Sequence, residues 1–125
     1  IDWDRPLFLR KPFAVVDSSY QLLAYLLSDM KKDLMAKNGE LHLVKLPIQL
    51  EFHDTYNDST IYNRRIVEER LEEITDALDI PYHNLNVPLR KLENPDDLYM
   101  DWDFHYDKDG HDWVAQQLYE HIKLP

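Results

Sequence analysis

Apolar residues recur at the three- and four-residue spacing of an amphipathic helix in three stretches of the chain. The first stretch predicts a helix over residues 18–37, with an N-cap among residues 17–19 and an end at Asn38-Gly39. The other two predict helices over 59–78 and 108–122. The three apolar stripes consist of Leu23, Leu26, Leu27, Met30 and Leu34; of Val67, Leu71, Ile74 and Leu78; and of Val114, Ala115, Leu118 and Ile122.

Short aliphatic stretches between these helices are typical of buried strands. Residues 41–46 end at Pro47 and predict a strand, and residues 82–85 form a weaker strand candidate, followed by a helical turn over 87–92. The alternation of helix and strand predicts a layered α/β fold with parallel strands. Two or three strands are few for a sheet that helices cover on both sides, so we expect a partial domain that spans residues 1–125, the C-terminal half of a doubly wound fold.

Composition narrows the classes of function. The chain has 125 residues, 44% of them apolar, which suffices for a packed core. A formal net charge of −10 disfavours nucleic acid and anionic lipid as partners. The absence of cysteine excludes disulfides, thiolate metal sites and a cysteine nucleophile, without fixing the compartment. The sequence predicts neither a membrane span nor a signal peptide, and because it does not begin with methionine we expect it to start inside a longer polypeptide.

Side chains that can take part in acid–base chemistry are concentrated near the end of the chain, where residues 101–112 contain five aspartates and two histidines. Asp103 lies two residues before His105, so its carboxylate can hold one ring nitrogen of the imidazole and leave the other free to take a proton. Asp107 is well placed as the N-cap of the last helix. Gly110 falls in the first turn of that helix, where a missing side chain permits close packing.

This run resembles the closing block of the SGNH (GDSL-type) hydrolases, in which an aspartate shortly precedes a histidine and an apolar helix follows. Residues 41–47 and 79–85 resemble the late strand and the next helix-to-strand passage of that family. The resemblance implies a flavodoxin-like three-layer α/β/α sandwich and a serine esterase, acyl hydrolase or acyltransferase. His105 would be the general base and Asp103 its partner acid, with no cofactor or metal. The implied substrate is a small ester or an acylated carbohydrate or lipid.

The chain departs from the family pattern in two respects. The family places its aspartate three residues before the histidine, where this chain has Trp102, so Asp103 is preferred and Asp101 is the reserve. The Gly-Asp-Ser block that carries the family's nucleophile is missing. Ser18 follows an apolar run as that serine does, but Val16 stands in place of the glycine, and we interpret Ser18 as a helix N-cap. The nucleophile is therefore expected in an upstream half of the domain or in another chain, with self-association as a further possibility.

Other interpretations of the same run stay open. The spacing from His105 to Gly110 resembles the first half of an EF-hand loop, although its first and twelfth positions, His105 and Gln116, do not fit. His105 and His111 with nearby aspartates offer a weak transition-metal site. The run can also be a solvated loop that caps an acidic helix start. Under that last interpretation the chain is a non-catalytic α/β binding or interaction module.

Overall fold

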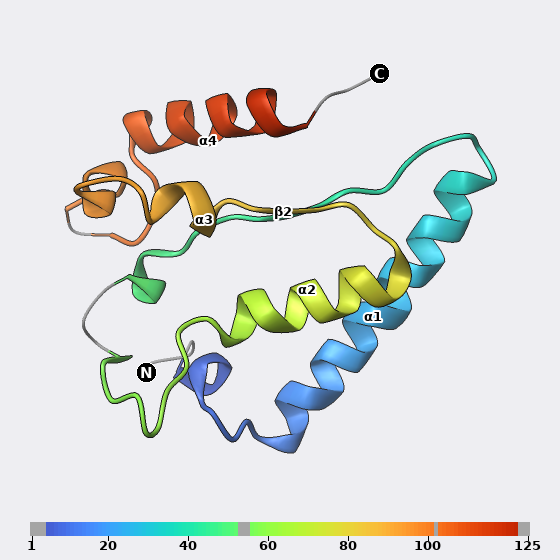
Figure 1. Cartoon of the computed structure of the whole chain (residues 1–125), viewed down its shortest axis with the longest axis horizontal. Helices are drawn as coiled ribbons and strands as arrows, with labels where there is room; N and C mark the ends of the chain where they lie inside the picture. Colours follow the sequence, from blue (N-terminus) through green and yellow to red (C-terminus); the bar gives the residue numbers. More distant parts are fainter. Residues whose placement is uncertain (1–4, 53–55, 102, 123–125) are drawn as a thin grey trace. The chain divides into compact units, whose positions relative to one another are not determined.

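The computed structural model describes residues 5–52, 56–101 and 103–122, drawn in colour in Figure 1. The chain divides into two compact units. The first comprises residues 1–43 and 56–82, and the second comprises residues 44–55 and 83–125.

The first unit is built on two packed helices, α1 (Ala14–Met35) and α2 (Ile66–Leu78) (Figure 1). Val16 and Leu27 are the buried residues of α1, and they stand on the face that turns toward the core of this unit. Arg70 of α2 joins the two helices through an ion pair of 3.1 Å with Asp17. A short 3-10 helix at Arg5–Phe8 adds the fully buried Phe8 ring to this core.

Both of these helices begin elsewhere than the sequence pattern predicts. The N-cap of α1 is Phe13, directly after Pro12, so Ser18 lies within the helix and its predicted capping role is wrong. The earlier start places Val16 in the core, and that burial outweighs the lack of a side-chain cap. In contrast, α2 starts seven residues later than predicted. Asp58 accepts hydrogen bonds from the Thr60 amide and hydroxyl, which fixes a turn where a helix was expected.

The two helices end in the same way, in a six-residue hydrogen-bonded turn whose fifth residue is left-handed. The left-handed residues are Asn38 (φ 58°) and Asp79 (φ 51°). The amide of Gly39 donates to the Leu34 carbonyl at 2.8 Å, in agreement with the predicted end of the first helix. The short side chains of asparagine and aspartate tolerate this backbone conformation better than most others.

The sheet consists of β1 (Leu43–Lys45) and β2 (Tyr82–Asn84), which are parallel. The Leu85 amide, just after β2, donates to the Lys45 carbonyl at 3.1 Å. The predicted α/β order with parallel strands is therefore confirmed at this coarse level. In the second unit, β2 leads into the short helix α3 (Asn86–Leu89), a 3-10 helix at Pro95–Leu98 and the last helix α4 (Lys108–His121).

Candidate functional site

The predicted dyad lies on a short loop of the second unit. Tyr99 and Tyr106 form an isolated antiparallel bridge, and their rings stack with centroids 4.9 Å apart. Beyond this bridge the Met100 amide donates to the His105 carbonyl at 3.0 Å, which closes the loop. The two tyrosines therefore form the base of what we name the dyad loop, whose described residues are 100, 101 and 103–105.

Within the dyad loop the structure brings the two predicted residues together. Nδ1 of His105 lies 2.7 Å from Oδ1 of Asp103, a hydrogen-bonding distance. The His105 side chain is 80% exposed and that of Asp103 41% exposed, so solvent reaches the ring. Asp101, the reserve acid, lies instead on the wall of a neighbouring cavity. Asp103 is therefore the carboxylate that orients the imidazole.

The start of α4 holds the chain immediately after the dyad loop. Oδ1 of Asp107 accepts a hydrogen bond of 2.8 Å from the Gly110 amide, which confirms the predicted N-cap. A Cβ atom added to Gly110 would lie 2.1 Å from the Leu98 carbonyl oxygen, far inside van der Waals contact. The close approach expected at Gly110 is therefore confirmed. The missing side chain allows α4 to pack directly against the segment that enters the dyad loop.

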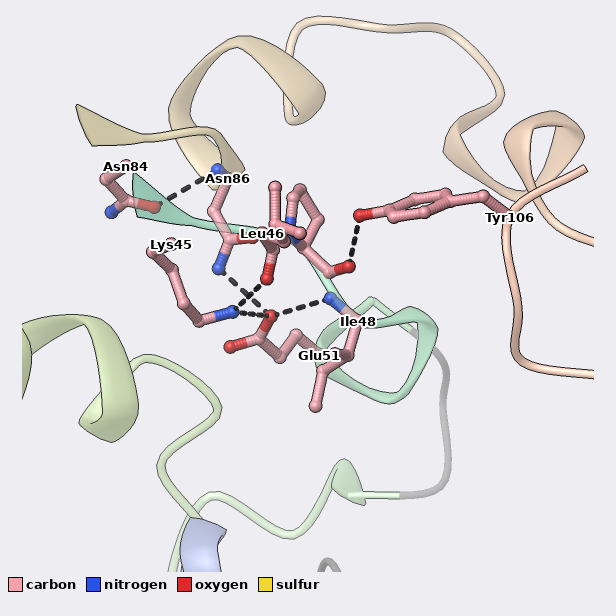
Figure 2. Close-up of polar contacts among 8 residues, drawn as sticks. Lys45, Leu46, Ile48, Glu51, Asn84, Asn86 and Tyr106 are labelled. Carbon is pink, nitrogen blue, oxygen red and sulfur yellow. Dashed lines mark hydrogen bonds and ion pairs between the residues drawn. The ribbon is translucent and has the colours of Figure 1, made fainter. Parts of the chain in front are cut away.

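A second anchor ties the dyad loop to the end of β1. The hydroxyl of Tyr106, the residue after His105, donates to the Pro47 carbonyl (Figure 2). The Tyr99 hydroxyl is buried beside the Tyr106 hydroxyl and interacts with it, but it is not aligned for a hydrogen bond with any described residue. Burial raises the pKa of both phenols, so both stay neutral at physiological pH.

Beneath this anchor lies a buried polar cluster, which we name the Glu51 cluster: Lys45, Glu51 and Asn86. Figure 2 shows the Lys45 ammonium and the Asn86 amide pointing at one Glu51 carboxylate oxygen, Oε2, at 2.7 and 3.1 Å. The same oxygen accepts from the Ile48 amide at 3.2 Å. All three side chains of the cluster are at least nine-tenths buried, so removing either Lys45 or Glu51 would leave the other charge buried without its counterpart.

Sequence reasoning missed the Glu51 cluster. Its members come from strand β1, the 3-10 helix Gln49–Glu51 and the start of α3, and 35 positions separate Glu51 from Asn86. One signal was present, because Lys45 interrupts an aliphatic run that ends at a proline. A cation in a buried strand requires a buried anion, although the sequence does not say which one.

An acidic cavity of about 530 Å³ opens beside the dyad loop. Gln49 and Asp96, on its wall, are joined by a hydrogen bond of 3.0 Å. The lining residues are Gln49, Asp96, Asp97, Tyr99, Met100, Asp101 and Asp107. Because the wall carries carboxylates and amide or hydroxyl groups, the cavity favours neutral polar or cationic groups over anions.

The remaining candidates gain no chemical role. Ser19 of α1 donates its hydroxyl to the Val15 carbonyl at 2.8 Å, and Ser18 is exposed one turn into the helix. Gly110 lies inside α4, which is incompatible with an EF-hand loop from His105. Within the described ranges no three His, Asp or Glu side chains are placed to hold a metal ion. His53 and Asp54, which the sequence favours as a polar pair of a loop over a pair that lines a site, lie outside the described residues.

Comparison with models of protein families, with curated proteins and with solved structures finds no match. Among the helices that the structure describes, none is long and apolar enough to cross a membrane.

Proposed function

We propose that this chain carries the general-base half of a serine acyl-transfer site of the SGNH type. One observation carries the proposal, namely the 2.7 Å contact between His105 Nδ1 and Asp103 Oδ1 on a loop anchored at both ends. In this proposal the two parallel strands belong to a flavodoxin-like three-layer sandwich. The nucleophilic serine and the oxyanion donors come from outside the described residues.

The proposed chemistry follows from the orientation of the ring. Asp103 holds the proton on Nδ1 of His105, so Nε2 is the basic nitrogen. Nε2 takes the proton of a serine hydroxyl as its oxygen attacks the ester carbonyl, and then delivers that proton to the departing alkoxide. Water hydrolyses the acyl-enzyme, or a second alcohol accepts the acyl group. The imidazolium formed in each step is stabilised by the Asp103 carboxylate.

The charge around the dyad bears on the substrate. Among the described residues of the second unit, ten Asp and Glu stand against four Lys and Arg, a formal charge of −6. Such a surface repels anionic substrates and accepts neutral ones. We therefore propose an uncharged ester, such as a small ester or an acylated neutral carbohydrate or lipid, as the substrate.

The test is labelling of the natural polypeptide that contains these residues with a serine-directed fluorophosphonate. We expect His105→Ala to abolish labelling and Asp103→Asn to slow it by two or more orders of magnitude, whereas Asp101→Asn labels at the original rate. His121→Ala is the matched control, because His121 is an exposed histidine of the same unit. Full-rate labelling of the His105→Ala protein, or no labelling of the unmodified one, would refute the proposal.

A second candidate function is a non-catalytic α/β interaction module. The observation that favours it lies on the first unit, where α1 exposes several large apolar side chains. A polypeptide that resists fluorophosphonate labelling and still associates through α1 would belong to this second class.

A further inference from the structure

The helix α1 buries one apolar face within its unit and leaves a second apolar strip exposed. Val15, Leu22, Leu26 and Met30 are 69%, 58%, 49% and 51% exposed. At 100° per residue these four side chains fall within an arc of about 80° on the helix. We name them the α1 strip. An apolar strip of this length on a helix is typical of a surface that another helix covers.

An apolar groove runs beside the N-terminal half of the α1 strip. It has a volume of about 310 Å³, and Val15 belongs to both the groove and the strip. Its only polar side chains are Ser19 and Tyr20, and the Ser19 hydroxyl already donates to a backbone carbonyl. The lining residues are Leu7, Val15, Val16, Ser19, Tyr20, Leu23, Val67 and Leu71. The groove is therefore shaped for an apolar side chain from an adjoining surface.

Charges of opposite sign stand at the two ends of the α1 strip. Lys11 precedes the helix, next to Arg10, whose amide is fastened to the Ile61 carbonyl at 2.9 Å. Asp33 stands near the C-terminal end of the helix, on the same side as Leu22. Both Lys11 and Asp33 are exposed, and no ion pair of either is found in the described part of the chain. Each lies eleven residues from Leu22, which is the middle of the strip.

We propose that the α1 strip pairs with the same strip of a second copy of this chain, antiparallel and about a twofold axis near Leu22. Antiparallel pairing places Lys11 of each copy near Asp33 of the other, which a parallel arrangement does not. It also brings Met30 of the second copy to Val15 and the groove. The proposal names the partner for the second candidate function and does not depend on the dyad.

The distribution of charge permits this self-association despite the net charge of −10. Among the described residues of the first unit, eleven Asp and Glu stand against nine Lys and Arg, a formal charge of −2. Most of the acidity resides in the second unit. Repulsion between two copies of the first unit is therefore weak, and the apolar contact decides the outcome.

The first test measures the mass of the 125-residue chain over a concentration series by sedimentation equilibrium. We expect a dimer, and we expect Leu22→Glu or Leu26→Gln to raise its dissociation constant about tenfold or more. Leu22 and Leu26 are exposed, so both variants should fold, which circular dichroism verifies. Gln21→Glu is the matched control, because it adds the same charge to an exposed position on another side of α1.

The second test reverses the charges at the ends of the strip. Lys11→Glu and Asp33→Lys should each weaken the dimer several-fold, and the double variant should recover most of the original affinity. A monomer at all concentrations overturns the proposal. A dimer that tolerates Leu22→Glu also overturns it, as does failure of the double variant to recover affinity, since a different surface or a parallel arrangement would then hold the copies together. Fluorophosphonate labelling reports on the dyad separately.

Discussion

At the scale of single residues, the two tyrosines at the base of the dyad loop differ in what their hydroxyls do. Both rings are packed against each other, but only the Tyr106 hydroxyl donates to a backbone carbonyl, that of Pro47. The Tyr99 hydroxyl is buried without an aligned partner. A buried polar group that forms no hydrogen bond destabilises the folded state, whereas one that does is held in place by it.

Phenylalanine substitutions separate these two roles. Tyr106→Phe should lower the free energy of unfolding by about 1–2 kcal/mol, because it leaves the Pro47 carbonyl without its donor. Tyr99→Phe should leave the free energy of unfolding unchanged or raise it by up to about 1 kcal/mol. Urea denaturation followed by circular dichroism measures both. Equal losses in the two variants would contradict the assignment of the hydrogen bond to Tyr106 alone.

The dyad could be predicted from sequence because its geometry is local. Asp103, His105, Asp107 and Gly110 all belong to one loop and the helix start that follows, so their spacing indicates which groups can meet, and the structure selects Asp103 over Asp101 as the partner of His105. The spacing of residues along the sequence cannot predict how much of a side chain is exposed to solvent. The 80% exposure of the His105 side chain depends on what packs around the loop, which is not encoded in the loop itself.

At the scale of elements, sequence patterns identified the helices and strands but misplaced the starts of two helices. The first helix starts before the predicted cap at residues 17–19, because the earlier start buries Val16. The helix α2 starts later than predicted, because Asp58 forms a turn near the predicted start. The C-terminal ends of the two helices lie close to their predicted positions, because each is set by a local signal: Asn38-Gly39 after α1 and the residues before Pro81 after α2. The Glu51 cluster could not be foreseen, since its members meet only when three separate elements pack.

The Glu51 cluster should respond to substitution as one unit. Glu51→Ala removes the anion that three donors share and leaves the buried Lys45 ammonium without it, so we expect a loss of about 3–5 kcal/mol. Lys45→Met should cost a similar amount. The double variant should lose clearly less than the sum of the two, because no lone charge then remains buried. A double-mutant cycle in urea measures this coupling, and simple additivity would mean that the two charges do not stabilise each other.

At the scale of the whole molecule, most of the net negative charge and the α1 strip belong to different units. The second unit carries the formal charge of −6 together with the dyad, and the first carries the α1 strip with a formal charge of −2. Total composition could not show this, because it averages the two units into one acidic, moderately apolar chain. Chemistry and association are therefore proposed for different units, and substitutions in one unit should leave the function of the other intact.

The stability of the protein should also fall at alkaline pH, with the onset set by buried tyrosines. Burial raises the pKa of Tyr99 and Tyr106 above the ordinary value of 10.0. Above about pH 10 the unfolded chain releases phenolic protons that the folded chain retains, so the free energy of unfolding decreases as pH rises, whereas below pH 10 these groups have no effect. We therefore expect the protein to unfold above pH 10. Circular dichroism together with tyrosinate absorbance measures this transition.

Removing one of these phenols should move that transition. Tyr99→Phe eliminates a buried group that must ionise on unfolding, so the midpoint of alkaline unfolding should shift to higher pH. Tyr119→Phe is the matched control, since it removes a phenol that is 87% exposed. If both variants unfolded at the same pH as the unmodified protein, tyrosine burial would not be what limits stability in alkali.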